Sequence, residues 1–484
     1  MAEALHQWLR DATGGEFKLD YALSALAWCR CLPSLAAVLP AVAWWNLLDH
    51  LLHTAAEAGA AGAGRELSDD EPLLHQLLAG ELALTLAYLF PEITACRQWM
   101  PAARQALSSG LANLLDGRGF LHARHFGRLR LLLACWTRCR ALGGRLKHGC
   151  WNHEAEKQYR RLVRNALRLA RRDGSHVFSS PSTDRSDAEL LLAAVALTGD
   201  QKGCTPAAAV HSEWAAAAVL RSDGSRSAPR LTVLYPDTSC RVELTCGKDV
   251  LCSGPWALEL HVDGTPAAPT SEWTKLCWVS DDDVDYLELE IEFGQRLCVQ
   301  RHLLLAREDR FLLLADAVLA SRRAAIEYRG TLPLCQGVTF REACETREGV
   351  LVGRKPRATV LPLALPEWLS DRRGGALAST RAGLELRQAA EAQALFAPLF
   401  FDLDRSRMNK PLTWRRLTVA ESQVVQPADV AAGYRVAIGN QQWLIYRSLT
   451  GSRNRSLLGH NLQSETLVAR FDRKGNVEPL IEIE

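Results

Sequence analysis

The sequence has little net charge and no long apolar run. Its 57 lysines and arginines nearly balance its 55 aspartates and glutamates, which leaves a formal net charge of +2. Overall charge therefore gives no attraction to a polyanion, so binding of that kind needs a local patch, and we expect no nucleic-acid partner. No segment reaches about 18 uninterrupted apolar residues, and we expect no membrane span.

Signals for export, for paired thiols and for common cofactors are also missing. The opening stretch MAEALHQWLRDATGG lacks the basic start and continuous apolar core of a secretory signal, so we expect a cytoplasmic location. None of the 14 cysteines forms a Cys-x-x-Cys pair, and reduced, buried thiols are the better interpretation. Phosphate-binding loops, dinucleotide fingerprints and serine-hydrolase elbows are absent as well, and we expect no cofactor.

The sequence does contain a change of hydrophobic period near residue 204. Residues 1–204 are rich in Leu, Ala, Trp and Arg, with apolar positions at the three- and four-residue intervals of helices. Later stretches alternate instead. DYLELEIEF at 285–293 predicts a half-buried strand with one apolar and one acidic face. We predict a helical domain over 1–204 and an antiparallel β-sandwich over 205–484.

The helical half carries a repeat. The turn-like segments DATGGEFKLDY, GAGRELSDDEP, DGRGFLHARH and DGSHVFSSPSTD begin about 50 to 57 residues apart, and each precedes an apolar helix. A period of this size fits one helical hairpin per repeat. Glycine supplies the positive φ of such a turn and aspartate caps nearby amides, so we interpret each Asp-Gly turn first as a structural joint.

Three stretches resemble the heparinase II/III-like group of polysaccharide lyases, which pair an α/α toroid with a β-sandwich. The stretches are LLDGRGFLHARHFGRLRLLLACW (114–136), RRDGSHVFSSPSTDRSDAELLLAAV (171–195) and LEIEFGQRLCVQRHLLLAREDRFLLLADAV (289–318). The resemblance implies a toroid that is incomplete here, since the helical half holds only roughly four hairpins. It also implies metal-independent β-elimination on an acidic, uronate-containing polysaccharide.

Such an elimination needs a group that neutralises the uronate carboxylate, a base for the C5 proton and an acid for the leaving oxygen. His122 and His125 lie in the loop after an Asp-Gly turn and are candidate catalytic residues. Asn152 and Tyr159, in CWNHEAEKQY, are the nearest match to the Asn-His and Tyr context of the active lyases. In the alternative interpretation the two loop histidines have a structural role only, in which they form hydrogen bonds to the loop backbone and cap the following helix. They also have the spacing of metal ligands, but nothing completes a set, so we predict no metal.

The candidate substrate-binding residues are Arg124, Arg161, Arg164, Arg301 and His302. In a helix, the four- and three-residue steps from Lys157 through Arg161, Arg164 and Arg168 to Arg171 form one stripe. The stripe is either a basic wall for an acidic glycan or an ordinary solvated face. Arg301 and His302 lie on a predicted strand, where they either face the groove or pair with glutamates of the neighbouring strand.

A second class of function is equally compatible with this sequence. A non-catalytic glycan-binding or interaction protein on the same scaffold would explain why the helical half is short. It would also explain why the Asn-His and Tyr context is matched only in part. Convergence of the candidate residues on one cleft would favour the enzyme.

Overall fold

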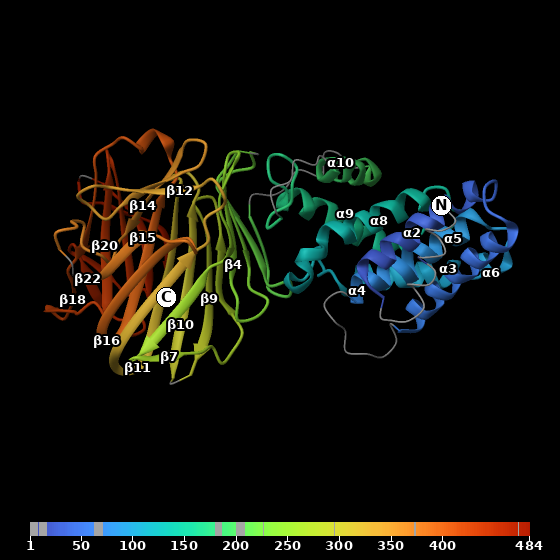
Figure 1. The fold of residues 1–484 in the computed structure, drawn as a ribbon. Coiled ribbons are helices and arrows are strands. Elements are labelled where there is room, and N and C mark those ends of the chain that lie inside the picture. The colour runs from blue at the N-terminus through green and yellow to red at the C-terminus, as the bar shows by residue number, and fades with distance from the viewer. Residues whose placement is uncertain are drawn as a thin grey trace. The chain divides into compact units, whose positions relative to one another are not determined.

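The computed structural model describes residues 8, 17–61, 71–179, 186–199, 209–225, 227–294, 296–371, 374–472 and 474–484. The chain divides into two compact units, Met1–Pro206, called here the helical unit, and Ala207–Glu484, the β unit (Figure 1). The boundary predicted at residue 204 and most of the first two turn-like segments lie outside the described residues, so these remain predictions.

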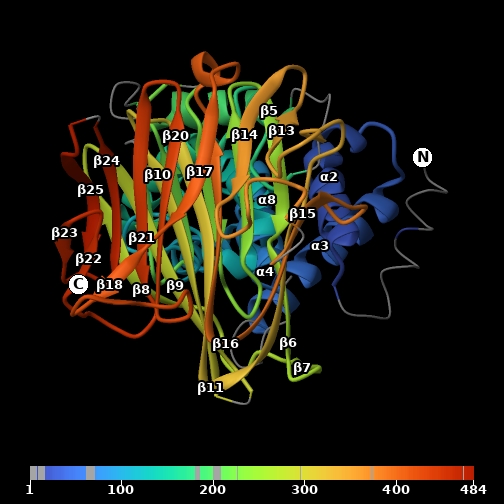
Figure 2. The same ribbon diagram turned by 90° about the vertical axis from the view of Figure 1, so that its left-hand side faces the viewer.

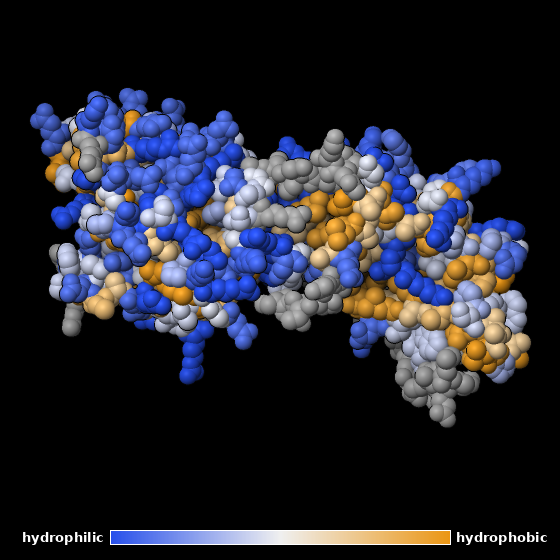
Figure 3. Space-filling view, turned by 90° about the horizontal axis from the view of Figure 1, so that it is seen from above, coloured by the Kyte–Doolittle hydropathy of each residue, from blue (hydrophilic) through white to orange (hydrophobic). Residues whose placement is uncertain are grey.

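The helical unit consists of helices joined by short turns. Its elements are α2 (Leu19–Leu35), α3 (Ala41–Ala61), α4 (Glu71–His75), the π-helix η1 (Gln76–Leu82), α5 (Ala83–Leu89), α6 (Thr94–Arg97), α7 (Met100–Asn113), the 3₁₀ helix η2 (Ala123–Arg128), α8 (Leu129–Gly143), α9 (His153–Leu169) and α10 (Ser186–Thr198). In Figure 3 apolar residues appear on the surface of this unit.

The π-helix η1 provides a polar centre within the helical core. Gln76 donates to the Ala106 carbonyl at 3.0 Å and accepts from the Trp136 indole at 2.9 Å. Glu81 is fully buried, and the Arg138 guanidinium donates to both of its oxygens at 2.6 and 2.7 Å. Because each buried polar group has a partner, the segment tolerates burial that would otherwise be costly.

The continuous helical segment Glu71–Leu89 is long and apolar enough to cross a membrane, the one such helix among the described residues. Of its most apolar window, 72% is buried inside the protein. Burial to this degree is what a core helix requires.

Within its described residues, the β unit contains four antiparallel sheets. One has the order β1 (Val210–Ser212), β2 (Ala217–Arg221), β3 (Arg230–Leu234), β4 (Arg241–Cys246), β5 (Asp249–Pro255). The largest has the order β12 (Thr339–Glu342), β13 (Gly349–Val352), β14 (Pro356–Pro362), β16 (Leu384–Asp402), β11 (Phe311–Leu332), β10 (Leu297–Ala306), β9 (Val284–Phe293), β8 (Thr274–Ser280), with β15 (Gly375–Ser379) on β16, β6 (Ala257–Val262) on β11, and β7 (Thr265–Ala267) on β6. A third has the order β17 (Leu412–Leu417), β20 (Ala431–Ile438), β21 (Gln441–Ser448), β24 (Thr466–Phe471), β25 (Val477–Ile483). A small sheet holds β19 (Val424–Val425), β18 (Val419–Glu421), β22 (Arg455–Leu457) and β23 (His460–Leu462), and the 3₁₀ helix η3 (Arg405–Arg407) follows β16.

The largest sheet is the middle layer of the β unit. The β17–β25 sheet covers one face, and the β1–β5 sheet lies against the other (Figures 1 and 2). The main core fills the space between the first two layers, where Phe311 and Phe400 meet Trp443 and Val468. The predicted fold class, helices followed by a large antiparallel β-sandwich, is therefore confirmed.

Covering both faces of the middle layer changes one expectation about β9. The alternating pattern predicted a half-buried strand with one apolar and one acidic face, and on the acidic face Glu292 is exposed and Glu290 half-buried, yet Glu288 is only 4% exposed. Asp285, on the opposite face, is fully buried. Asp285 accepts from the Arg221 amide of β2 at 2.8 Å, and the Arg447 guanidinium of β21 donates to Glu288 at 3.4 Å. Both carboxylates are thus enclosed by layers that the local sequence does not reveal.

Candidate functional site

The first described Asp-Gly turn follows α7 and is built by its aspartate. Asp116 Oδ1 accepts from the amides of Arg118 at 2.8 Å and Phe120 at 2.7 Å. Gly119 has φ +79°, a left-handed conformation that glycine adopts without strain. The chain then reverses, and His122 emerges directly after the turn. The turn is therefore a structural joint, as predicted, and it also positions the loop that carries the histidines.

His122 begins the 3₁₀ helix η2 and caps it. Its Nδ1 accepts from the Arg124 amide at 3.2 Å, so in the neutral ring the proton resides on Nε2. The ring centroid of His125 lies 6.3 Å away. His125 is half-buried, and its Nδ1 has no hydrogen-bond partner among the described residues. The two histidines are thus close neighbours in different environments.

The second described Asp-Gly turn, after α9, lies beside the first. Asp173 Oδ1 accepts from the Ser175 amide at 2.9 Å, and Gly174 has φ +88°. The Phe126 ring of η2 lies 5.1 Å from the His176 ring that follows this turn. His176 therefore lies against the 3₁₀ helix that carries His125. The sequence analysis did not select His176 as a candidate, although the repeated turn motif was its signal.

Helix α9 packs directly on the first turn. Arg161 donates to the Gly117 carbonyl at 2.8 Å, and Gln158 donates to the Asp116 carbonyl at 3.0 Å. A Cβ atom on Gly119 would lie 2.5 Å from the Arg161 Cβ, so this glycine is required by close approach as well as by φ. Residues far apart in sequence, the His122 loop and the middle of α9, are in this way joined in one region.

The basic stripe of α9 is shorter than the sequence suggested. The helix ends at Leu169, and Ala170 is extended, so Arg171 lies beyond the stripe. Its guanidinium donates to the Ser179 carbonyl at 3.0 Å and holds the second turn. Arg161, Arg164 and Arg168 remain on the helix and are half-buried.

Two further candidates on α9 have structural contacts. Asn152 is the N-cap, and its Oδ1 accepts from the Ala155 amide at 2.8 Å. Tyr159 is fully buried and donates from its hydroxyl to Thr137 at 3.1 Å. Burial raises the pKa of Tyr159 to about 12. The catalytic roles of Asn152 and Tyr159 stay predictions.

The two candidates on β10 are enclosed in the β unit. Arg301 is fully buried and pairs with Asp316 of β11 at 2.8 and 3.0 Å, with its guanidinium 3.8 Å from the Trp256 ring centre. Burial alone would lower the pKa of Arg301, but Asp316 raises it above its ordinary value. His302 is 2% exposed and bonds through Nδ1 to the Tyr286 hydroxyl at 2.8 Å. The partner of Arg301 is thus an aspartate of the next strand, not a glutamate of β9.

A histidine–tyrosine pair in the β unit gave no sequence signal, because its members lie on separate strands. His211 Nε2 lies 2.6 Å from the Tyr235 hydroxyl, and the His211 ring stacks on Trp278 at 5.2 Å. Burial raises the pKa of Tyr235.

Positive charge is concentrated in the chain that builds the turns and α9. Residues 114–172 contain fifteen lysines and arginines but three aspartates and glutamates, in a protein whose net charge is +2. Of those three carboxylates, Asp116 caps its turn, Glu154 pairs with Lys157, and Glu156 pairs with Arg140 and Arg160. This segment therefore carries a local excess of positive charge that the overall net charge conceals. Within the described residues, no group of three or more metal-ligating side chains is present.

Comparison with known proteins shows what this architecture resembles. No protein-family model matches the sequence, and no curated protein matches it. The crystal structure of heparan sulfate lyase HepC from Pedobacter heparinus is 13% identical, covers 93% of this chain and 78% of its own, and has a TM-score of 0.58. Heparinase III is 10% identical with a TM-score of 0.61, covering 93% and 79%. The heparinase III-BT4657 gene product is 10% identical with a TM-score of 0.58, covering 93% and 80%.

This chain has the fold of heparinase III. The resemblance to the heparinase II/III-like lyases is therefore confirmed at the level of fold. Identities of 10 to 13% carry no residue-level assignment, and the function must be argued from this chain's own side chains.

Proposed function

We propose that the protein binds an acidic, uronate-containing polysaccharide through the helical unit. The surface concerned, here called the basic surface, consists of His122, Arg124, His125, Arg161 and Arg164. The proposal is carried by the local charge: residues 114–172 contain fifteen basic residues and only three acidic ones. Guanidinium groups suit carboxylates and sulfates because they donate two parallel hydrogen bonds to them. Several such contacts together give affinity that one exposed pair lacks.

We further propose that bound uronate is cleaved by β-elimination. Arg124 and Arg161 would neutralise the carboxylate and so make the C5 proton more acidic. His125, whose half-buried ring lies beside His122, would accept that proton. His122, which carries its proton on Nε2 when neutral, would donate it to the leaving oxygen.

A non-catalytic binding protein is the second candidate, and specific contacts favour it. Asn152 is occupied as a helix cap, and the Tyr159 hydroxyl is buried against Thr137. A tyrosine with a pKa raised to about 12 is a poor base near neutrality. In this version the basic surface holds the polysaccharide and no bond is broken.

Binding is tested with the double variant Arg161→Ala and Arg164→Ala against immobilised heparan sulfate. Losing two charge contacts with the polysaccharide, of about 0.5–1 kcal/mol each, should raise Kd roughly 5- to 30-fold, and more at low salt where screening is weakest. The matched control is Arg415→Ala with Arg416→Ala, two exposed arginines of β17 in the β unit. Equal losses in both double variants, or no salt-dependent binding by the wild type, would overturn the proposal.

Cleavage is tested by the ultraviolet absorbance of the conjugated C4–C5 double bond that elimination leaves in the product. Heparan sulfate, hyaluronan and alginate are the substrates to compare. His125→Ala should lower the rate by about 10²- to 10⁴-fold while leaving binding largely intact. Salt-dependent binding without any absorbance would establish the non-catalytic candidate in place of the lyase.

A further inference from the structure

The first Asp-Gly turn presents an arginine that the sequence analysis did not select. Arg118 lies at the tip of this turn, between Gly117 and Gly119, and its side chain is exposed. Its guanidinium has no hydrogen-bond or ion-pair partner among the residues that the structure describes. Such a guanidinium can donate two parallel hydrogen bonds to a carboxylate or sulfate without first giving up a contact within the protein.

The backbone of Arg118 is fixed, although its side chain is free. The amide of Arg118 donates to Asp116 Oδ1 at 2.8 Å, and its carbonyl accepts from the Asn165 side chain of α9 at 2.9 Å. Asn165 is 2% exposed, and the Arg168 guanidinium donates to its Oδ1 at 2.6 Å. Both backbone groups of Arg118 are therefore held, and the point from which its side chain extends is set by the fold.

Helix α9 holds the other carbonyls of the turn in the same way. Gln158, which is 8% exposed, donates to the Asp116 carbonyl at 3.0 Å, and Arg161 donates to the Gly117 carbonyl at 2.8 Å. Gln158, Arg161 and Asn165 are spaced by three and four residues, so they lie on one face of the helix. Three consecutive carbonyls are thus bound by three side chains, and a turn held in this way loses little freedom when a ligand binds.

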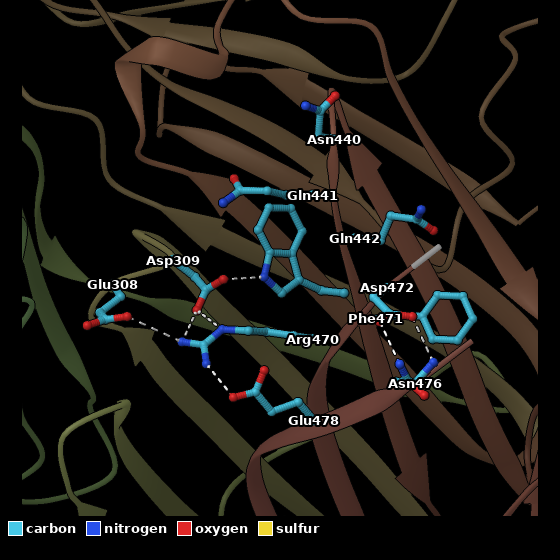
Figure 4. Close-up of a pocket in the computed structure, with 11 residues that line it drawn as sticks. Glu308, Asp309, Asn440, Gln441, Gln442, Arg470, Phe471, Asp472, Asn476 and Glu478 are labelled. Atoms are coloured by element: carbon cyan, nitrogen blue, oxygen red, sulfur yellow. Dashed lines mark hydrogen bonds and ion pairs between the residues drawn. The ribbon is translucent and has the colours of Figure 1, made fainter. Parts of the chain in front are cut away.

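An arginine of the β unit shows the opposite arrangement. Arg470 lines a pocket, where it donates to Asp309 at 2.8 Å and to Glu478 at 3.1 Å (Figure 4). Its charge is already compensated by carboxylates of its own chain. Residues 114–130, by contrast, contain four arginines and one carboxylate, that of Asp116, whose Oδ1 accepts two amides of the turn. An anionic ligand therefore meets less competition at Arg118 than at Arg470.

We propose that Arg118 anchors an anionic group of the polysaccharide and that Asn165 is its positioning residue. This inference rests on the proposed function, and it extends the basic surface to the tip of the first Asp-Gly turn. Because the side chain of Arg118 extends from a fixed point, it binds an anionic group within a limited region. The turn is then a binding element as well as a structural joint.

The experiment measures binding of the full chain to immobilised heparan sulfate, with urea unfolding as the check on folding. Arg118→Ala should raise Kd roughly 2- to 5-fold. It should leave stability unchanged, because the exposed guanidinium has no partner to lose. Arg381→Ala is the matched control, at an exposed arginine in the tight turn between β15 and β16, and should bind as the wild type does. Equal affinity in the two variants would overturn the anchor.

A double-mutant cycle tests the role of Asn165. Asn165→Ala should raise Kd roughly 2-fold in the wild-type background and leave it unchanged in Arg118→Ala, because a positioning residue acts through the side chain that it positions. The same fold-change in both backgrounds would show that Asn165 supports only the stability of the helical unit. If Asn165→Ala fails to fold, Gln158→Ala, which releases the Asp116 carbonyl, takes its place in the cycle.

The wild type separates this inference from the proposed function. A wild type that does not bind heparan sulfate would overturn both. Salt-dependent binding that Arg161→Ala with Arg164→Ala weakens, but Arg118→Ala does not, would leave the proposed function standing and overturn the anchor alone.

Discussion

Burial determines what individual charged residues do in the β unit. Arg301 and His302 are adjacent on β10, and each bonds to a side chain of a neighbouring strand. Both are enclosed because β10 lies in the covered middle layer. Taking a charge out of water is costly unless a partner compensates, which Asp316 does for Arg301. His302 avoids the cost by staying neutral, since burial and nearby Arg447 hold its pKa well below the ordinary value.

Neutral His302 predicts a pH dependence of stability. The unfolded ring takes up a proton near its ordinary pKa of 6.5, while the folded ring does not. Below that pH the unfolded state binds one more proton, so stability falls as pH falls, by up to about 1.4 kcal/mol per pH unit. His302→Gln removes this loss and keeps a polar partner for Tyr286. Urea unfolding from pH 7 to pH 5 should show the wild type losing stability relative to the variant.

The groups around His302 do not change the expected difference in stability between the wild type and His302→Gln. Burial raises the pKa of Glu288, which makes its own contribution run in the opposite direction, but Glu288 is present in both proteins. Tyr286, Phe396 and Arg447 also face the ring in both. Two unfolding curves that stay parallel across this pH range would show that the folded His302 titrates normally.

Some of these residue positions were readable from the sequence. Tyr159 shares a helix face with Leu162, Val163 and Ala166, so periodicity already indicated burial. Arg301 is two residues from Val299 and from Leu303, so the three side chains lie on the same, mostly apolar face of the strand. The partner Asp316 was harder to foresee, because it depends on the register of the β10–β11 hairpin.

At the scale of elements, the contact between the first Asp-Gly turn and α9 determines the local geometry. Gly119→Ala would force a Cβ to within 2.5 Å of Arg161 Cβ and would strain a residue at φ +79°. We expect a loss of roughly 2–4 kcal/mol from the combined clash and strain, measured by urea unfolding. The matched control is Gly117→Ala, two residues earlier, where an added Cβ meets nothing within 4 Å. Similar losses in both variants would mean that the turn is not docked on α9 as described.

Element boundaries show where local sequence stops being informative. The charge pattern suggested that the α9 stripe runs to Arg171, but the helix ends at Leu169 because the chain enters the Asp173-Gly174 turn. Strand β9 was predicted correctly as a strand. On its acidic face Glu288 is buried, whereas Glu292 stays exposed. The burial of Glu288 comes from a separate sheet, which is a matter of tertiary packing.

The whole molecule consists of two units of different secondary structure. We expect limited proteolysis to cut near residues 200–212, where the two units join, because connections that few contacts cross are preferred sites. Circular dichroism should then give a helical signal from the N-terminal fragment and a β signal from the C-terminal one. A single resistant core would contradict the division.

The period of the hydrophobic residues alone predicted that a helical half is followed by a β half. The three layers of the β unit did not, because they depend on contacts between strands far apart in the chain, such as β2 with β9. The candidate site, too, could be predicted from the sequence only in part. The Asp116 turn was readable from its motif, whereas its contact with Arg161 requires the folded chain.

The pairing of β11 with β16 has a consequence for how fast the protein forms. These strands are 22 and 19 residues long, and Phe311 pairs with Asp402 across all the chain that forms β12 to β15. Closing so large a loop loses chain entropy before the contacts between the two strands can stabilise the structure. Such β structures therefore fold in the millisecond-to-second range. The helical unit, built from local contacts, should form sooner. During synthesis it also emerges first, so it is complete while the β unit still waits for β16.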